Sequence, residues 1–124
     1  MAGGSETILV VEDDDRVRLI AAEALRAQGY EILVAGNGED ALALAVARHE
    51  PIHLLLTDVV MPIMNGRQLS QAVTTIHPET TTLFTSGYTE NIIASHGMLE
   101  EGLGKPYSLD SLVRRIRRLL DRKG

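Results

Sequence analysis

Short apolar runs alternate along this chain with longer segments in which apolar residues recur every three or four positions. Strands that are covered on both faces of a parallel sheet read as nearly continuous apolar runs. Four runs are predicted to be strands, and they span Thr7–Val11, Glu31–Ala35, His53–Thr57 and Thr82–Ser86. A fifth strand within Glu100–Lys105 is the weakest prediction, because that segment has one large apolar residue and two glycines.

The segments between these runs have helical spacing. Apolar residues recur at i, i+3, i+4 and i+7 in residues 17–24 and 69–76, and residues 38–49 are rich in alanine. Residues 109–120 carry the plainest apolar stripe, and Ser108 is the expected N-cap of that helix. Alternating strands and helices favour βαβ units, which build a parallel sheet with right-handed crossovers.

The whole chain is expected to hold one domain. Residues 1–6 (MAGGSE) read as a flexible leader rich in glycine and serine, and residues 7–122 as the domain. A βα unit takes roughly 20–25 residues, so about five units fit into the chain. A domain of 124 residues can bury a core without disulfides or a structural metal.

Composition removes several classes of function. The chain has no cysteine, which rules out disulfides and thiolate metal sites and favours a cytoplasmic location. Twelve basic and seventeen acidic residues give a net charge of −5, which argues against a nucleic-acid partner. No apolar run is long enough for a membrane span, and the first residues do not form a signal peptide.

Polar side chains follow the predicted strands at the edge where parallel sheets bind ligands. Glu12 and Asp13 follow the first strand, Asp58 the third, Ser86 ends the fourth, and Lys105 follows the fifth. Carboxylates that converge at about 4 Å repel by about 4 kcal/mol per pair, and a hard cation such as Mg²⁺ offsets that repulsion. A carboxylate beside Mg²⁺ can attack a phosphoryl group and form an aspartyl phosphate.

The motifs ILVVEDD, LLLTDVVMPIMNG, TSGY and KPY, in this order, resemble those of a two-component response-regulator receiver domain. The resemblance covers residues 7–120 and implies a flavodoxin-like (βα)5 fold. Such a fold is a doubly wound parallel sheet of strand order 2-1-3-4-5, here with a short or irregular fifth strand. The leader together with the first strand, GGSETILVVEDD, further resembles the linker before the C-terminal receiver of hybrid histidine kinases, so either an excised or a stand-alone receiver is expected.

The resemblance also implies roles for individual residues. Asp58 would be the phosphoacceptor and a Mg²⁺ ligand, with Asp13 a second direct ligand and Glu12 acting through water. The backbone carbonyl of Val60 would complete the protein ligands. Two further residues would contact the phosphoryl oxygens: Ser86 would be the switch hydroxyl, and Lys105 the lysine that neutralises one oxygen.

The function implied by the resemblance is a Mg²⁺-dependent phosphorylation switch that signals by protein contact. Its phosphodonor would be a sensor or hybrid histidine kinase or a histidine phosphotransfer protein. The only reactions that it would catalyse are its own phosphorylation and dephosphorylation. A dimer through the face of the fourth helix, fifth strand and last helix is a further possibility. The output partner is left open, with neither nucleic acid nor membrane expected.

Three other functions are weighed against this one. Gly102 stands where the family usually has an aromatic residue, which favours a receiver-like interaction module that no longer switches on phosphorylation. A phosphatase with an aspartate nucleophile is disfavoured, because Val60 stands where such enzymes place a general acid. A flavin-binding domain is disfavoured as well, because acids replace a phosphate-binding loop after the first strand.

Some charged residues have simpler interpretations. Asp14 and Asp15 are expected to cap a helix and to form its acidic first turn. His49, His53, His77 and His96 lack metal-ligand spacing and are expected to be surface or packing residues. The arginines of the last helix are expected to form a solvated face, with a docking or dimer role left open.

Overall fold

The computed structural model describes residues 4–86, 102–104 and 109–123. Within them, five parallel strands form one sheet in the order β2-β1-β3-β4-β5. The strands are β1 (Thr7–Val11), β2 (Glu31–Ala35), β3 (Leu54–Asp58), β4 (Thr81–Ser86) and β5 (Gly102–Gly104). The helices are α1 (Asp15–Ala27), α2 (Gly38–Ala47), α3 (Gly66–Ile76) and α5 (Leu109–Lys123). The predicted α/β fold and its strand order are confirmed.

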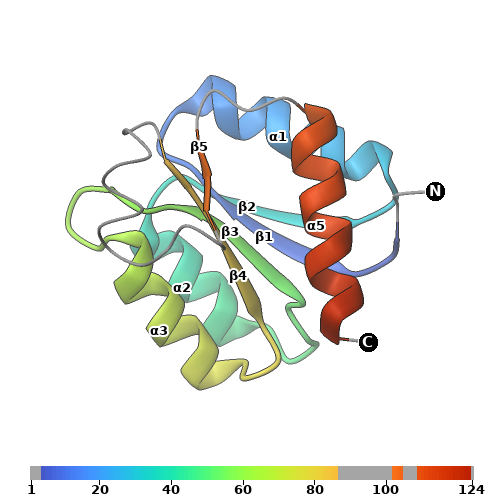
Figure 1. The fold of residues 1–124 in the computed structure, drawn as a ribbon. Coiled ribbons are helices and arrows are strands. Elements are labelled where there is room, and N and C mark those ends of the chain that lie inside the picture. The colour runs from blue at the N-terminus through green and yellow to red at the C-terminus, as the bar shows by residue number, and fades with distance from the viewer. Residues whose placement is uncertain (1–3, 87–101, 105–108, 124) are drawn as a thin grey trace.

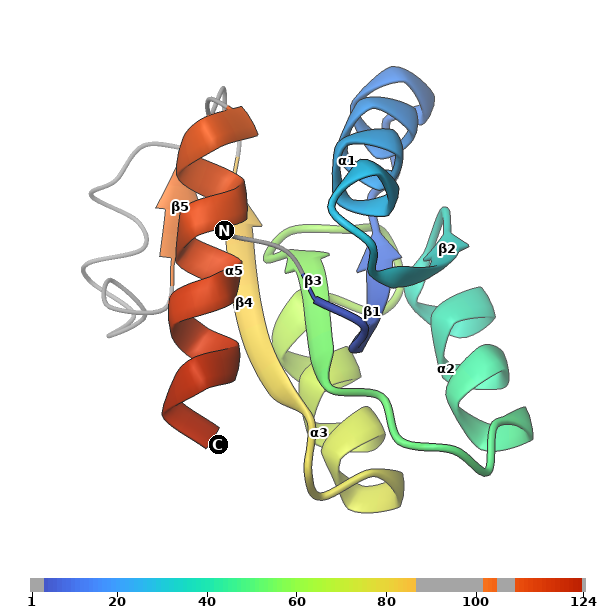
Figure 2. The same cartoon turned by 90° about the vertical axis from the view of Figure 1, so that its right-hand side faces the viewer.

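The sheet lies between two layers of helices. Helices α1 and α5 cover one face, and α2 and α3 cover the other (Figure 1). The turned view shows the arrowheads of β1, β3, β4 and β5 pointing to the same edge (Figure 2). The carboxyl ends of the strands therefore share one edge, which is where the sequence places its polar side chains.

Each face of the sheet has its own core because side chains alternate along a strand. Ile8 and Val10 of β1 pack with the buried residues of α1 and α5, whereas Leu9 and Val11 pack with those of α2 and α3. All four side chains are at most 1% exposed. Complete burial of one such side chain is worth about 1.5–3 kcal/mol, so the central strand anchors both layers.

Helices α1 and α3 each begin directly after a residue whose side chain caps the helix N-terminus. Asp14 caps α1 by accepting from the amides of Arg16 and Val17, and Asp15 is the acidic residue of the first turn, as predicted. Asn65 caps α3 in a capping box with Gln68, whose side chain accepts from the Asn65 amide. The caps fix where α1 and α3 leave the carboxyl edge of the sheet.

Two strands have boundaries that differ from the prediction by one residue. β3 runs from Leu54 to Asp58 rather than from His53 to Thr57, and β4 begins at Thr81 rather than Thr82. The register accounts for this, because Leu54 pairs with Thr81 and Asp58 still pairs with Thr85. Asp58 thus belongs to the sheet itself and does not begin the following loop.

The short fifth strand is confirmed. β5 has three residues, Gly102–Gly104, and pairs in parallel with Phe84 to Ser86 of β4. Its position at the edge of the sheet beside β4 is the one that the family resemblance implied. The expected cap Ser108 and the predicted fourth helix lie outside the described residues.

Candidate functional site

Three acids meet at the carboxyl edge of the sheet. Glu12 and Asp13 follow β1, Asp58 ends β3, and one carboxylate oxygen from each lies within 4.8 Å of the others. Glu12 and Asp58 are only 4% and 3% exposed, whereas Asp13 is open to solvent. The topology brings them together because β1 and β3 are neighbours in the sheet.

Two threonines hold Asp58 in place. The Thr85 hydroxyl donates to Asp58 Oδ1 over 3.3 Å, and the Thr57 hydroxyl donates to the Asp58 backbone carbonyl over 3.0 Å. Both threonines are buried. Thr85 is a site residue that sequence reasoning missed, although its position one residue before Ser86 and in register with Asp58 is a signal for it.

The loop after Asp58 turns back sharply onto β3. The Gly66 amide donates to the Val59 carbonyl over 2.8 Å, and the Val59 amide donates to the Thr85 carbonyl over 3.0 Å. A Cβ atom at Gly66 would overlap the Asp58 carbonyl oxygen, so only glycine fits at the start of α3. Val60, the predicted carbonyl ligand, lies in this loop with its side chain 48% exposed.

Glu12 is fixed through its backbone and its side chain. Its amide donates to the Ala35 carbonyl of β2 over 3.2 Å, and its carbonyl accepts from Arg18 Nη1 over 2.7 Å. The Glu12 carboxylate accepts from the Asp14 amide over 3.0 Å. Arg18 is a second residue that sequence reasoning did not single out, and nothing in its spacing from Glu12 distinguishes it from the other arginines of the chain.

The remaining predicted site residues are placed only in part. Ser86 is the last residue of β4, at the same edge as Asp58, but its side chain is not among those described. Lys105 lies directly after β5 in the sequence and outside the described residues. Their predicted contacts with a phosphoryl group therefore stay predictions.

The donor set of the acidic cluster fits a hard divalent cation. All three groups offer carboxylate oxygens, the ligands that Mg²⁺ prefers. Two negative charges about 4.8 Å apart repel by about 3.5 kcal/mol at an effective dielectric near 20. A cation held between Glu12, Asp13 and Asp58 would remove that cost, and a mostly buried cluster would hold it away from bulk water.

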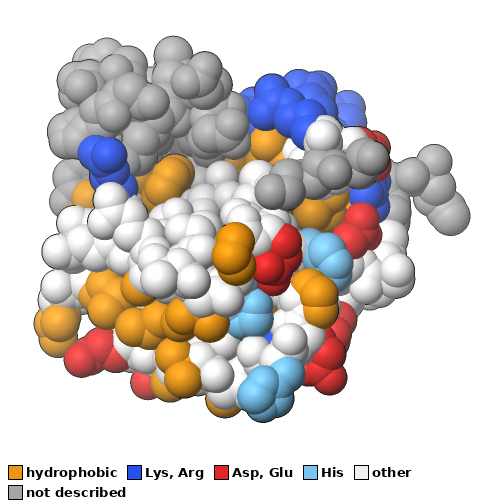
Figure 3. Space-filling view, turned by 90° about the horizontal axis from the view of Figure 1, so that it is seen from below, with side chains coloured by type: hydrophobic (Ala, Val, Ile, Leu, Met, Phe, Trp, Pro, Cys, Tyr) orange, Lys and Arg blue, Asp and Glu red, His pale blue; other side chains and the backbone are white. Residues whose placement is uncertain are grey.

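Two of the described histidines, His53 and His77, have hydrogen-bond partners within the fold. His77 is buried, with Nε2 2.8 Å from the Ala45 carbonyl and Nδ1 3.1 Å from Glu79, and His53 Nδ1 accepts from the Thr7 amide. Seen from below, histidines lie among acidic, hydrophobic and other side chains (Figure 3). In the described ranges, the only group of three or more potential metal ligands is the acidic cluster, and the interpretation of the histidines as surface or packing residues stays a prediction. His96 lies outside the described residues.

Comparison with known proteins agrees with this geometry. The family of the response regulator receiver domain matches residues 8–117. The chain belongs to this family. Receiver domains are signalling switches of two-component systems rather than enzymes that turn over an external substrate.

Two relatives show how the match is distributed. The response regulator receiver protein CpdR of Brucella abortus is 35% identical over 116 residues, which cover 91% of this chain and 95% of CpdR. The sensor kinase CckA of the same organism is 33% identical over 123 residues, which cover 97% of this chain but 13% of the kinase. The chain thus spans a whole receiver protein and a small part of a kinase.

Solved structures give the same result. The receiver domain of the hybrid histidine kinase CckA is 36% identical, with a TM-score of 0.79 over 92% of this chain and 98% of that one. A response regulator receiver protein from Sinorhizobium medicae superposes with a TM-score of 0.85 over 97% of this chain and 98% of that one. Its identity of 22% supports the fold alone. In the described part of this receiver domain, no helix is long and apolar enough to cross a membrane.

Proposed function

We propose that this receiver domain is a phosphorylation-dependent switch that accepts a phosphoryl group on Asp58. The observation that carries the proposal is the convergence of Glu12, Asp13 and Asp58 within 4.8 Å, with Asp58 at the end of a central strand. Asp58 is attached to the sheet by its backbone pairing and by Thr85. An acid held this rigidly is suited to in-line attack on a phosphorus atom.

The acidic cluster is proposed to hold Mg²⁺, with Asp13 and Asp58 as direct ligands, Glu12 acting through water, and the Val60 carbonyl as a further ligand. Bound Mg²⁺ would offset the repulsion among the carboxylates and neutralise charge on the phosphoryl oxygens. Glu12 and Asp13 prepare the site by holding negative charge beside Asp58, and the Thr85 hydroxyl orients the attacking carboxylate.

The proposed reaction is a phosphoryl transfer. An Asp58 carboxylate oxygen attacks phosphorus, the bond from phosphorus to the donor's imidazole nitrogen breaks, and the imidazole leaves with its electron pair and takes up a proton. Ser86 is proposed to donate a hydrogen bond to one phosphoryl oxygen, and Lys105 to neutralise another. The product is an aspartyl phosphate, which water hydrolyses back to Asp58 and inorganic phosphate.

The proposed partners follow from the chemistry and from the relatives. A sensor or hybrid histidine kinase, or a histidine phosphotransfer protein, would supply the phosphoryl group, which the match to the receiver part of a sensor kinase supports. Output is proposed to occur by protein contact. A dimer through the face of the fourth helix, the fifth strand and the last helix stays a prediction. A cytoplasmic location likewise rests on the cysteine-free sequence.

A receiver-like module that binds its partner without phosphorylation is the second candidate function. It is favoured by the shortness of β5 and by glycine at position 102. Switching in the family couples the phosphoryl group to an aromatic residue at that position, and Gly102 offers no side chain for this.

Intact-mass measurement after incubation with acetyl phosphate separates the two candidates. The switch predicts one phosphoryl adduct on the wild-type chain in the presence of Mg²⁺, and none without Mg²⁺ or with Asp58→Asn. A folded wild-type protein that forms no adduct would contradict the switch and favour the phosphorylation-independent module. Far-ultraviolet circular dichroism of both proteins provides the control for folding.

A further inference from the structure

The side chain of Arg18 links two points of the acidic loop. Its Nη1 donates to the backbone carbonyl of Glu12 over 2.7 Å, and its Nη2 lies 2.5 Å from Asp15 Oδ1. The first contact lies on the residue that begins the acidic pair, and the second lies on the first turn of α1. One planar guanidinium therefore joins the end of β1 to the start of α1.

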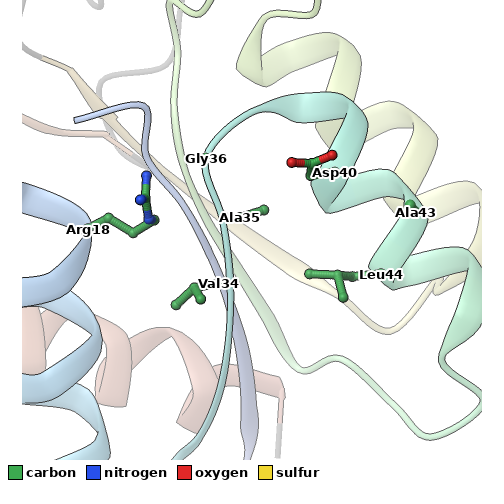
Figure 4. A pocket seen from close by; sticks show the side chains of 7 residues that line it. All are labelled: Arg18, Val34, Ala35, Gly36, Asp40, Ala43 and Leu44. Carbon is green, nitrogen blue, oxygen red and sulfur yellow. The ribbon is translucent and has the colours of Figure 1, made fainter. Parts of the chain in front are cut away.

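The fold provides space for this guanidinium. Arg18 lines a pocket of about 500 Å³ between α1, the end of β2 and α2, together with Val34, Gly36, Asp40 and Leu44. Arg18 reaches from α1 toward the end of β2 near Gly36, and Asp40 and Leu44 lie on the other side of that strand (Figure 4). A Cβ atom at Gly36 would lie only 3.1 Å from Arg18 Nη1, so glycine leaves room for the cation.

The backbone of Glu12 is consequently held at both its amide and its carbonyl. Its amide donates to the Ala35 carbonyl of β2, and its carbonyl accepts from Arg18. These two contacts fix the direction in which the chain leaves β1, and with it the positions of the Glu12 and Asp13 carboxylates relative to Asp58. Removal of Arg18 takes away the contact with the Glu12 carbonyl, whereas the Ala35 contact with the Glu12 amide and the Asp14 contact with the Glu12 carboxylate stay in place.

We propose that Arg18 is a positioning residue for the metal centre, acting through the backbone carbonyl of Glu12. The inference rests on the proposed function, because it requires that Glu12, Asp13 and Asp58 bind Mg²⁺. The positively charged Arg18 would thus help to bind a positively charged ion, although charge repulsion alone would make Arg18 weaken Mg²⁺ binding.

The sign of the effect distinguishes positioning from charge. Arg18 carries a positive charge beside the acidic cluster, so its removal makes the local potential more negative and, by charge alone, strengthens Mg²⁺ binding. Loss of the contact with Glu12 loosens the ligand geometry and weakens Mg²⁺ binding, since Mg²⁺ demands near-ideal octahedral coordination. The two mechanisms predict opposite changes in the dissociation constant.

The test is a titration with MgCl₂ at constant ionic strength, followed by backbone amide resonances, on the wild type, Arg18→Ala, Arg18→Lys and Arg16→Ala. Arg16 is the matched control, because it is an exposed arginine on the same turn of α1. Positioning predicts a dissociation constant about tenfold higher for Arg18→Ala, equivalent to about 1.4 kcal/mol. The dissociation constant of Arg18→Lys is expected to lie between those of the wild type and Arg18→Ala. Arg16→Ala is expected to bind Mg²⁺ as tightly as the wild type or more tightly.

Equal or tighter Mg²⁺ binding by Arg18→Ala overturns the inference, as does an equal loss in Arg16→Ala. If Arg18→Ala does not fold, Arg18→Lys gives the answer, because lysine keeps the charge but not the two-pronged geometry. Unchanged affinity in Arg18→Lys would then contradict positioning. If the wild-type protein binds no Mg²⁺, the metal part of the proposed function is overturned. If the wild type and Arg18→Ala bind Mg²⁺ equally well, only the inference about Arg18 is overturned.

Discussion

At the scale of the residue, the contact between Glu6 and Arg117 shows how a side chain near the start of the chain is fixed. Arg117 Nη2 donates to Glu6 Oε2 over 2.7 Å, and Nη1 to Oε1 over 3.1 Å. The same guanidinium lies 2.9 Å from Asp121 on the next turn of α5. The hydrogen bond from Arg117 lowers the pKa of Glu6, against a smaller effect of burial, which raises it.

This lowered pKa predicts a pH-dependent contribution to stability. A depressed carboxyl pKa stabilises the fold above the pKa of the unfolded chain, and the contribution is lost as the pH falls through the folded value. Glu6→Gln is therefore expected to lower the free energy of unfolding by about 1 kcal/mol near neutral pH, and by much less once the pH is below the lowered pKa of Glu6 in the folded protein. Urea denaturation at several pH values measures this difference.

Asp121→Asn is the control for this prediction, because it removes a 67% exposed carboxylate and leaves the Glu6 contact in place. It is expected to change stability little at any pH. A Glu6→Gln effect of the same size at acidic and neutral pH would show that the ion pair is not its origin.

Some contacts of the site could be predicted from the sequence and others could not. Asp13 and Asp58 could be predicted to meet, because strand ends in a parallel sheet share an edge. The Glu6–Arg117 and Arg18–Glu12 contacts could not, because they depend on helix orientation and on side-chain reach. Glu6 was assigned to a leader, yet it contacts α5.

At the scale of the element, the junction between β3 and α3 carries the tightest steric requirement near the site. Gly66 lies against the Asp58 carbonyl with no room for a Cβ atom. Gly38 occupies the same position at the start of α2, also after an asparagine cap. There a Cβ atom would lie 2.9 Å from both the Cβ and the Sδ of Met64, of which the Sδ can move by a rotamer change and the Cβ only with the backbone of its loop.

Alanine at these two glycines is expected to have unequal effects. Gly66→Ala should lower the free energy of unfolding by about 2–3 kcal/mol, because rigid backbone must move. It should also displace Asp58 and weaken Mg²⁺ binding. Gly38→Ala should cost less, since its nearest contacts lie at 2.9 Å, farther away than the Asp58 carbonyl oxygen is from a Cβ atom at Gly66, and part of the Met64 side chain can change rotamer. Denaturant unfolding of both variants checks the order, and equal losses would contradict the steric account.

Elements were predicted more accurately than their ends. β1 and β2 have the predicted bounds, because uninterrupted apolar runs define them. β3 is shifted by one residue, because register with β4 includes Asp58 in the sheet despite its charge. Local hydrophobicity cannot indicate that pairing, since an acid at the end of a strand looks like the first residue of a loop.

At the scale of the whole molecule, the fold brings Glu12, Asp13 and Asp58 together at one edge of a sheet whose two faces are closed by separate apolar cores. Helix α1 joins these features, because it packs its buried face on the sheet and holds Glu12 through Arg18. Phosphorylation of Asp58 would change charge at the point where β3 meets this edge. The predicted switch thus depends on the arrangement of the layers as well as on three acids.

Identification of the residue that carries the phosphoryl group tests whether Asp58 is the phosphoacceptor. Asp58→Asn alone leaves Glu12 and Asp13 as alternative acceptors within 4.8 Å. Borohydride reduces an aspartyl phosphate to homoserine, so peptide mapping of the reduced, phosphorylated wild-type protein identifies the acceptor. Homoserine is expected at position 58 after incubation with acetyl phosphate and Mg²⁺. Reduction at Asp13 or Glu12, or no reduction product in a folded protein that binds Mg²⁺, would contradict it.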